Sequence, residues 1–306
     1  MKKKGIALVE RQYLFPFVLI TSLFFLWGFA HAILDVLNKH FQELLTITRT
    51  HSAMIQATMY MGYFIMAIPA GLFINRHGYR KGVVLGLLLY GIGSLLFIPG
   101  QYIASFNMFL FSLFVIGCGL TFLETAANPY VTELGARETA ASRLNFAQSF
   151  NGLGCIFAPI LTGFLLFSDE EQGASGNVAL PYAVMGVIVL LAALAFMRVR
   201  LPEIPHEEEV DSEGHRVGLW AHKLFVFGLV ALFAYEVSEI SINSFFINYV
   251  TEVGWMNARD ASLVLSFGGL GLFMVGRFVG AGLCAASVPR RCSSGVPRER
   301  LSLRCW

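Results

Sequence analysis

Four carboxylates interrupt long apolar stretches of the chain: Asp35, Glu124, Glu236 and Glu239. An ionised side chain at the centre of a bilayer costs roughly 2.5–3.5 kcal/mol on insertion scales, so an acid there marks a functional site by default. Removal from water disfavours the charged form of a carboxyl group. We therefore expect Asp35 and Glu124 to take up and release protons near neutral pH.

Polar side chains accompany these acids at helical spacing. Residues three or four apart lie on one face of an α-helix. Five apolar stretches carry one polar stripe each: Trp27, His31, Asp35 and Asn38; Gln56, Tyr60 and Tyr63; Glu124 and Asn128; Asn145, Gln148 and Asn151; Glu236, Glu239 and Asn243. Because the surroundings of each stripe are apolar, we expect the stripes to converge on one cavity.

The chemistry of these stripes suits a sugar. Amides and carboxylates are hydrogen-bond partners for hydroxyl groups, and Trp27 offers an apolar face to a sugar ring. A proton moving with the membrane field gains about 2.3 kcal/mol per 100 mV, enough to drive uphill uptake. We therefore expect a monosaccharide and protons as partners. The expected sugar-binding residues are Trp27, His31, Asn38, Gln56, Tyr60, Asn128, Gln148, Asn151, Glu239 and Asn243.

Each of these residues also has a purely structural interpretation. Asp35 can lie solvated at the outer end of its helix, and Glu124 can have a structural role. Amide stripes often only hold helices together. His31 can relay protons or simply pack with its hydrogen bonds satisfied, and one of Glu236 and Glu239 can face a loop.

Apolar stretches long enough to cross a bilayer carry the stripes. A spanning helix needs about 20 mostly apolar residues. The runs without charged residues predict about eight spans, near 12–34, 50–75, 82–98, 105–129, 144–168, 172–197, 224–250 and 260–283. The third and fourth are expected to separate at Pro99-Gly100-Gln101, a turn signal.

Bulk composition also indicates an all-α integral membrane protein surrounded by a lipid bilayer. Apolar residues make up 56% of the chain and charged residues 14%, against about 25% charged in soluble domains. The net charge of +2 gives no argument for a nucleic-acid partner. The five cysteines form neither a metal-binding spacing nor a disulfide framework, so no metal or cofactor is expected.

The distribution of Lys and Arg predicts the orientation in the membrane. With a cytoplasmic N-terminus, 18 of the 22 basic residues fall on the cytoplasmic side, Lys39, Arg49 and Arg259 fall outside, and Arg277 lies within a span. The pattern predicts a six-helix half over residues 1–199, a cytoplasmic linker over 200–223 and a pair of helices over 224–283.

Two groups of motifs resemble a known family. The segment 71–81, Gly-Leu-Phe-Ile-Asn-Arg-His-Gly-Tyr-Arg-Lys, resembles the major facilitator loop signature, with Asn75 where that motif usually has an acid. The segment 123–129, Leu-Glu-Thr-Ala-Ala-Asn-Pro, together with 144–151 and 24–35, is similar to the L-fucose permease group of fucose, galactose and glucose:proton symporters. The resemblance covers about residues 12–283.

The resemblance implies a major facilitator fold of twelve helices in two halves, alternating access and proton-coupled monosaccharide import across a bacterial inner membrane. It matches Asp35 and Glu124 to the group's proton-linked carboxylates, and Gln148 and Asn151 to its sugar-facing amides. We expect a monomer. The segment 30–35 departs from the fucose permease itself, which leaves the sugar open.

The last residues differ from the rest. Residues 284–306 hold three cysteines and five arginines with no helical period, which indicates a frameshifted tail rather than a natural basic one. The chain would then lack four helices of the second half, and we expect it not to transport as written.

Two other functions have weaker support. An intramembrane enzyme needs a nucleophile with its base or paired metal ligands, and no second histidine in a span joins His31 and Asp35. A non-transporting sugar sensor needs a substantial soluble region, and the linker is too short to be one. We therefore expect no catalytic residues.

Overall fold

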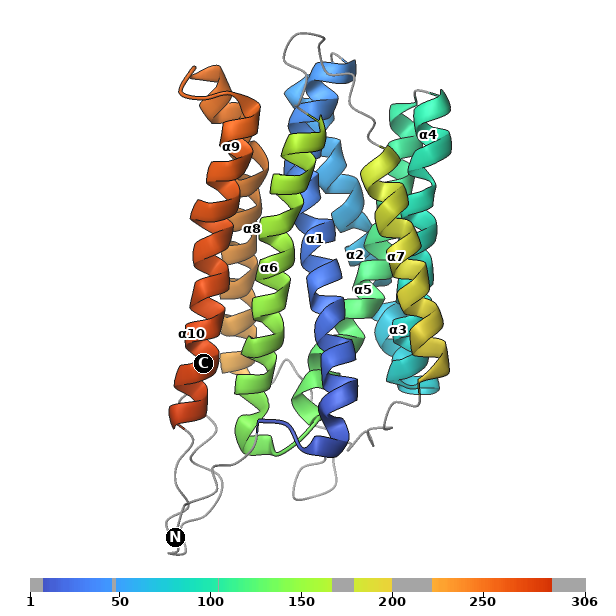
Figure 1. Cartoon of the computed structure of the whole chain (residues 1–306), viewed down its shortest axis with the longest axis vertical. Coiled ribbons are helices and arrows are strands. Elements are labelled where there is room, and N and C mark those ends of the chain that lie inside the picture. Colours follow the sequence, from blue (N-terminus) through green and yellow to red (C-terminus); the bar gives the residue numbers. More distant parts are fainter. Residues whose placement is uncertain (1–7, 46–47, 104, 167–178, 200–221, 288–306) are drawn as a thin grey trace, which may run out of the picture.

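The computed structural model describes residues 8–45, 48–103, 105–166, 179–199 and 222–287. The predicted linker and tail lie almost entirely outside these residues. The described part is a bundle of long helices (Figure 1). Its helices are α1 (Leu14–Leu45), α2 (Arg49–His77), α3 (Tyr79–Leu95), α4 (Phe97–Ile103), α5 (Phe106–Glu133), α6 (Ala140–Leu166), α7 (Ala179–Arg198), α8 (Lys223–Glu252), α9 (Ala258–Leu265) and α10 (Gly271–Ser287).

Short irregular turns complete the described chain. They are the 3-10 turns η1 (Arg11–Tyr13) and η2 (Arg137–Thr139), and the π-helical turn η4 (Ser266–Leu270), which joins α9 to α10. We call the end of the bundle where α1 and α8 begin the inner end, and the end where they finish the outer end.

Seven described segments are long and apolar enough to cross a membrane. They are Arg11–Asn38, Thr50–His77, Tyr79–Ile103, Phe106–Glu133, Ala179–Arg198, Lys223–Glu252 and Ala258–Cys284. The remaining predicted span corresponds to α6, a helix of 27 residues that packs along α1 and α10 in the same bundle. An all-α membrane protein with about eight long helices is therefore confirmed.

The boundary between the third and fourth spans lies later than the sequence predicts. Pro99-Gly100-Gln101 is not a turn, because all three residues lie inside α4. Pro99 occupies the first turn of that helix, where the missing N–H removes no intrahelical hydrogen bond. The chain turns only after Ile103, where the Ser105 side chain caps α5 by accepting a hydrogen bond from the Met108 backbone N–H.

Two glycines allow α1 to lie directly against α6. A Cβ atom at Gly28 would be 2.1 Å from the Asn151 carbonyl oxygen, and one at Gly154 would be 2.1 Å from the Phe25 carbonyl oxygen. In lipid, where apolar burial drives helices together only weakly, small residues permit this close backbone approach. The contact brings the polar stripes of α1 and α6 to the same side of the bundle.

A buried arginine joins the elements at the inner end. Arg143 is 0% exposed, and its planar guanidinium has five N–H groups to place. They donate to the backbone oxygens of Val131, Thr132, Ala136 and Leu8 and to Thr139 Oγ1. Arg143 thereby satisfies carbonyl groups at the end of α5 and ties the turn before α6 to the N-terminal segment.

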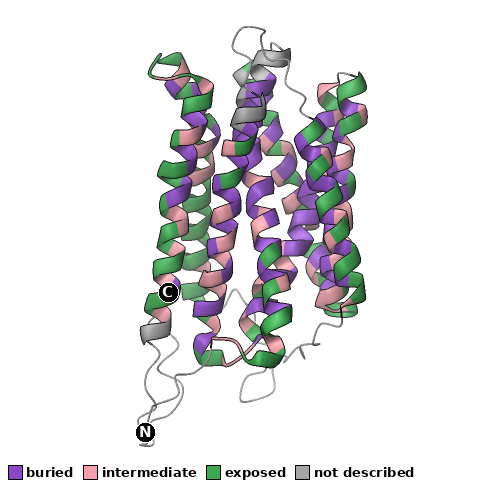
Figure 2. Cartoon of the chain, viewed as in Figure 1, coloured by how far each residue is buried: buried purple, intermediate pink, exposed green. Residues whose placement is uncertain are grey.

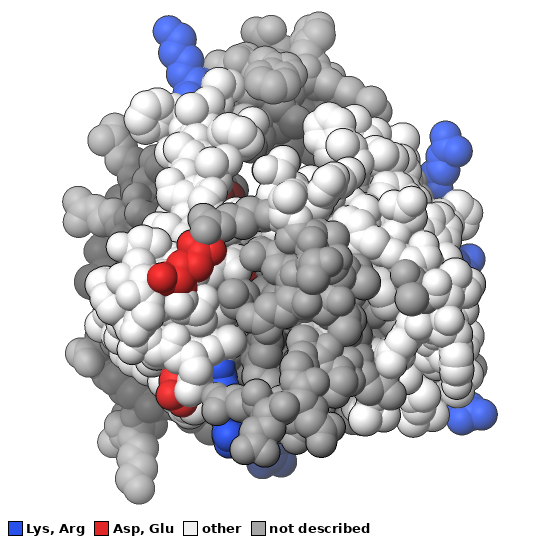
Figure 3. Space-filling view, turned by 90° about the horizontal axis from the view of Figure 1, so that it is seen from above, with Lys and Arg blue, Asp and Glu red and all other residues white. Residues whose placement is uncertain are grey.

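The outside of the bundle is apolar. Figure 2 shows exposed residues along the outward faces of α8 and α10, and buried residues where α1 meets α5 and α6. On α8, Leu224 is 80% exposed and Phe227 is 75% exposed. From the outer end, most of the described surface carries neither acidic nor basic side chains (Figure 3). The outward apolar faces of α8 and α10 require lipid rather than water as their neighbour.

Candidate functional site

Helices α1, α2, α5, α6, α8 and α10 surround a cavity of about 450 Å³. This volume is within the range of roughly 300–1,000 Å³ that small-molecule sites occupy. Most of the predicted site residues line it: Trp27, His31, Asp35, Gln56, Tyr60, Glu124, Gln148, Asn151, Glu239 and Asn243. Each of the five stripes therefore contributes residues to one cavity, but Asn145 of the α6 stripe does not line it, and its Nδ2 donates instead to the Ala141 backbone oxygen at 3.0 Å.

Asn38 and Asn128 are the two expected sugar-binding residues that do not line the cavity. Asn38 lies almost one turn beyond Asp35, and its Oδ1 accepts a hydrogen bond of 3.3 Å from Asn248 Nδ2 of α8. Asn128 lies one turn beyond Glu124, and its Oδ1 accepts a hydrogen bond of 3.3 Å from Gln148 Nε2. Both asparagines hold neighbouring side chains in place.

Asp35 lies where three helices meet. Its Oδ1 accepts hydrogen bonds from Gln56 Nε2 of α2, at 3.2 Å, and from Ser244 Oγ of α8, at 3.3 Å. The residue is 8% exposed. Asp35 is thus buried and bonded, which excludes the interpretation of a carboxylate solvated at the helix end.

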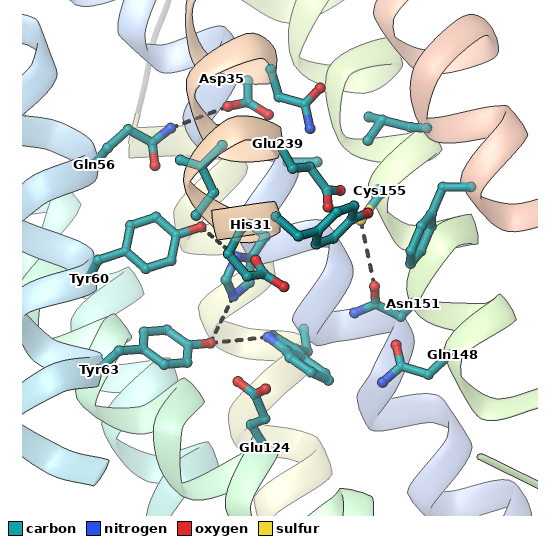
Figure 4. A pocket seen from close by; sticks show the side chains of 18 of the residues that line it. His31, Asp35, Gln56, Tyr60, Tyr63, Glu124, Gln148, Asn151, Cys155 and Glu239 are labelled. Atoms are coloured by element: carbon teal, nitrogen blue, oxygen red, sulfur yellow. Dashed lines mark hydrogen bonds between the residues drawn. The ribbon is translucent and has the colours of Figure 1, made fainter. Parts of the chain in front are cut away.

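His31 is held between two tyrosines in the wall formed by α1 and α2 (Figure 4). Its Nε2 is 2.7 Å from the Tyr63 hydroxyl oxygen, and its Nδ1 is 3.3 Å from the Tyr60 hydroxyl oxygen. The Trp27 indole N–H donates to the same Tyr63 oxygen at 3.0 Å. Both ring nitrogens of His31 therefore have partners within the protein.

Side chains of α6 both line the cavity and hold α6 against α1. Asn151 Nδ2 donates to the Phe24 backbone oxygen of α1 at 3.2 Å. Cys155 Sγ donates to the Gly28 backbone oxygen at 3.4 Å. Asn151 thus faces the cavity and also joins α6 to α1, so the functional and the structural interpretations of this stripe apply together.

The remaining wall comes from α8 and α10. Glu236, Glu239 and Asn243 all line the cavity, so neither glutamate faces a loop. Arg277 of α10 lines it too, with its guanidinium carbon 5.0 Å from the centroid of the Phe273 ring. Four carboxylates thus share the cavity with one guanidinium. Among the described residues, no group of His, Cys, Asp or Glu is arranged to hold a metal ion.

The polar and aromatic lining residues outside the predicted stripes are Cys155, Tyr235, Phe273 and Arg277. Tyr63 and Glu236 belong to predicted stripes but were not given a sugar-binding or proton-coupling role. Helical spacing could have found some of the first four. Cys155 is four residues after Asn151, and Tyr235 is four residues before Glu239. Phe273 and Arg277 belong to a helix whose sequence shows no polar stripe, so only the structure brings them to the site.

Comparison with known families decides the class of protein. The model of the Major Facilitator Superfamily matches residues 17–293. The chain belongs to this superfamily. It is 35% identical over 280 residues to a glucose/galactose transporter of Brucella abortus biovar 1 (strain 9-941), covering 89% of this chain and 67% of the relative. It is 34% identical over 307 residues to the L-fucose-proton symporter of Escherichia coli (strain K12), covering 92% of this chain and 70% of the relative.

Solved structures agree with this assignment. A variant of the E. coli fucose:proton symporter superimposes with a TM-score of 0.68 at 31% identity, over 90% of this chain and 72% of the symporter. The same transporter in its outward conformation gives a TM-score of 0.66 at 33% identity. The resemblance to the L-fucose permease group is thereby confirmed. This major facilitator chain spans about two thirds of the length of these relatives.

Proposed function

We propose that this major facilitator protein takes part in proton-coupled import of a monosaccharide, with the sugar bound in the central cavity and no catalytic step. The observation that carries the proposal is Asp35. This buried acid lines the cavity and is hydrogen-bonded to α2 in one direction and to α8 in the other. A proton on Asp35 can therefore affect the sugar site and the contact between the two halves together.

The remaining roles follow from the chemistry of the lining. Gln148, Asn151, Asn243 and Gln56 present amides to sugar hydroxyl groups. The Trp27 ring supplies an apolar face, and Glu124 takes up the coupling proton with Asp35. Relatives whose names specify glucose, galactose or L-fucose transport support a hexose or deoxyhexose as the cargo.

We propose a monomer in a bacterial inner membrane with its N-terminus in the cytoplasm. In this orientation the outer end faces outward. There the bonds between Asp35 and Ser244 and between Asn38 and Asn248 hold α1 against α8. The beginning of α8 is exposed instead, as Leu224 and Phe227 show. These contacts support a conformation that is closed toward the outside between α1 and α8.

Measuring the protons that the protein takes up or releases when sugar binds tests the coupling directly. Protein in lipid nanodiscs, in weakly buffered solution with a pH dye, is mixed with D-glucose, D-galactose or L-fucose. We expect proton uptake on sugar binding, reduced in Asp35→Asn and in Glu124→Gln. Asp260→Asn, at an exposed acid that does not line the cavity, serves as the matched control and should behave like the parent. Equal proton uptake in all variants would refute the assigned roles.

A further inference from the structure

Four side chains of α1 and α2 form a continuous hydrogen-bonded chain in the cavity wall (Figure 4). It runs from Trp27 Nε1 to the Tyr63 hydroxyl, at 3.0 Å, and from there to His31 Nε2, at 2.7 Å. It continues from His31 Nδ1 to the Tyr60 hydroxyl, at 3.3 Å. All four residues line the cavity. Every member of the hydrogen-bonded chain therefore faces the space proposed for the sugar.

The first bond gives the chain a direction. An indole N–H can only donate, so the Tyr63 oxygen accepts from Trp27. The Tyr63 hydroxyl hydrogen is then available for donation to His31 Nε2. In the opposite order the Tyr63 oxygen would accept from both Trp27 and His31, and its own hydrogen would have no acceptor among these four side chains.

The direction of hydrogen-bond donation continues through the His31 imidazole. A neutral imidazole has one donor nitrogen and one acceptor nitrogen. With Nε2 accepting from Tyr63, the hydrogen lies on Nδ1 and is donated to the Tyr60 oxygen. Ring contacts restrict rotation of the imidazole, because the His31 ring meets the rings of Trp27 and Tyr63 edge to face, at centroid distances of 6.0 and 5.5 Å.

The charged side chains that line the cavity favour donation by the Tyr60 hydroxyl, the last group of the hydrogen-bonded chain. Asp35, Glu124, Glu236 and Glu239 line the cavity, and Arg277 is the basic side chain among the described lining residues. In the described part of the chain, no hydrogen bond joins any of them to the His31 ring. The excess of carboxylates attracts the hydrogen of the Tyr60 hydroxyl toward the cavity.

We propose that the Tyr60 hydroxyl is a fixed hydrogen-bond donor to one oxygen of the bound sugar, and that His31 is the positioning residue that sets this direction. A sugar hydroxyl at this point accepts from Tyr60 and donates its own hydrogen to a carboxylate of the cavity. A site built in this way discriminates against a sugar that lacks that hydroxyl. The inference rests on the proposed function and specifies how the site selects its sugar.

Deoxy analogues of the bound hexose test the role of Tyr60. We expect one monodeoxy analogue to bind the parent about five- to tenfold more weakly than the sugar itself, the effect of one neutral hydrogen bond. In Tyr60→Phe this difference should disappear, with the other analogues retaining their order. Tyr249→Phe, at an exposed tyrosine of α8 that does not line the cavity, should keep the difference. If Tyr60→Phe weakens the binding of the sugar and of every analogue by the same factor, or weakens none of them, the proposal is overturned.

The histidine tautomer provides a second readout that a merely structural role does not predict. Nitrogen NMR of protein labelled at the imidazoles of its seven histidines, assigned by subtraction with His31→Gln, should show the hydrogen of His31 on Nδ1. Tyr63→Phe should shift His31 toward a mixture of tautomers. A hydrogen on Nε2, or on both nitrogens, would overturn the inference alone, whereas absence of any sugar binding would overturn the proposed function as well.

Discussion

Replacing Gly28 by Ala is predicted to force α1 and α6 apart. The added Cβ atom would lie 2.1 Å from the carbonyl oxygen and 2.8 Å from the carbonyl carbon of Asn151, whereas ordinary contacts begin at 3.4 Å. The obstructing atoms belong to the backbone, so no side-chain rotation relieves the clash. The helices must move by more than an ångström at this point.

Separation of α1 and α6 lowers the free energy of unfolding by an amount that follows from the contacts between these two helices. Overpacking of a tight core costs about 1–3 kcal/mol. The bond from Asn151 Nδ2 to the Phe24 oxygen crosses the same interface, and a neutral hydrogen bond contributes about 0.5–1.5 kcal/mol. We therefore expect Gly28→Ala to lower the free energy of unfolding by about 2–4 kcal/mol. At about 2–4 °C per kcal/mol for a large domain, the melting temperature should fall by roughly 5–15 °C.

Buried cysteines offer the assay. Cys118 and Cys155 are 6% and 9% exposed, so a thiol-reactive fluorophore labels them as the detergent-solubilised protein unfolds on heating. The cysteines at 284, 292 and 305 are replaced by serine to lower the background. Gly276→Ala is the matched control, because nothing lies within 4 Å of its added Cβ atom. Melting of Gly28→Ala within 2 °C of this control would refute the packing described for α1 and α6.

Three further predictions concern other parts of the structure. The double variant Ser244→Ala, Asn248→Ala removes the hydrogen bonds between α1 and α8 at the outer end. An impermeant maleimide added outside intact cells should then label Cys155 faster than in the parent. An unchanged labelling rate contradicts closure at this end. Arg143→Lys, which replaces a planar fork by a single ammonium, should lower the melting temperature, whereas Arg76→Lys at an exposed position should not. Asn128→Ala releases Gln148 and should weaken sugar binding about two- to fivefold, the effect of losing one positioning bond; equal affinity in a binding assay shows that Asn128 has no such role.

The arrangement of spans follows from the sequence because lipid imposes a simple requirement. Backbone groups in a bilayer must bond within helices, and the length of an apolar run then determines each span. The junction near Pro99 shows the limit of local signals. Proline is compatible both with a turn and with the first turn of a helix, and its sequence neighbourhood does not distinguish the two.

Helical periodicity predicts which residues share a face, and this is why most of the cavity lining was predictable. It does not give the depth at which α1 and α8 meet. Asn38 therefore lies in the contact with α8, just beyond the cavity, although it shares a stripe with Asp35. The direction of the bonds around His31 needs the positions of Tyr60 and Tyr63 on another helix, which no spacing within α1 contains.

The most direct test of the account is equilibrium binding of radiolabelled D-glucose, D-galactose and L-fucose to the 306-residue protein in nanodiscs. We predict saturable binding of at least one of these sugars, displaced by the unlabelled sugar and strongly weakened in Gln148→Ala, whose side chain lines the cavity. Asn257→Ala, which changes a helix cap away from the cavity, should bind like the parent. Absence of saturable binding of all three sugars, or binding unaffected by Gln148→Ala, would contradict the assignment of this cavity as a sugar site.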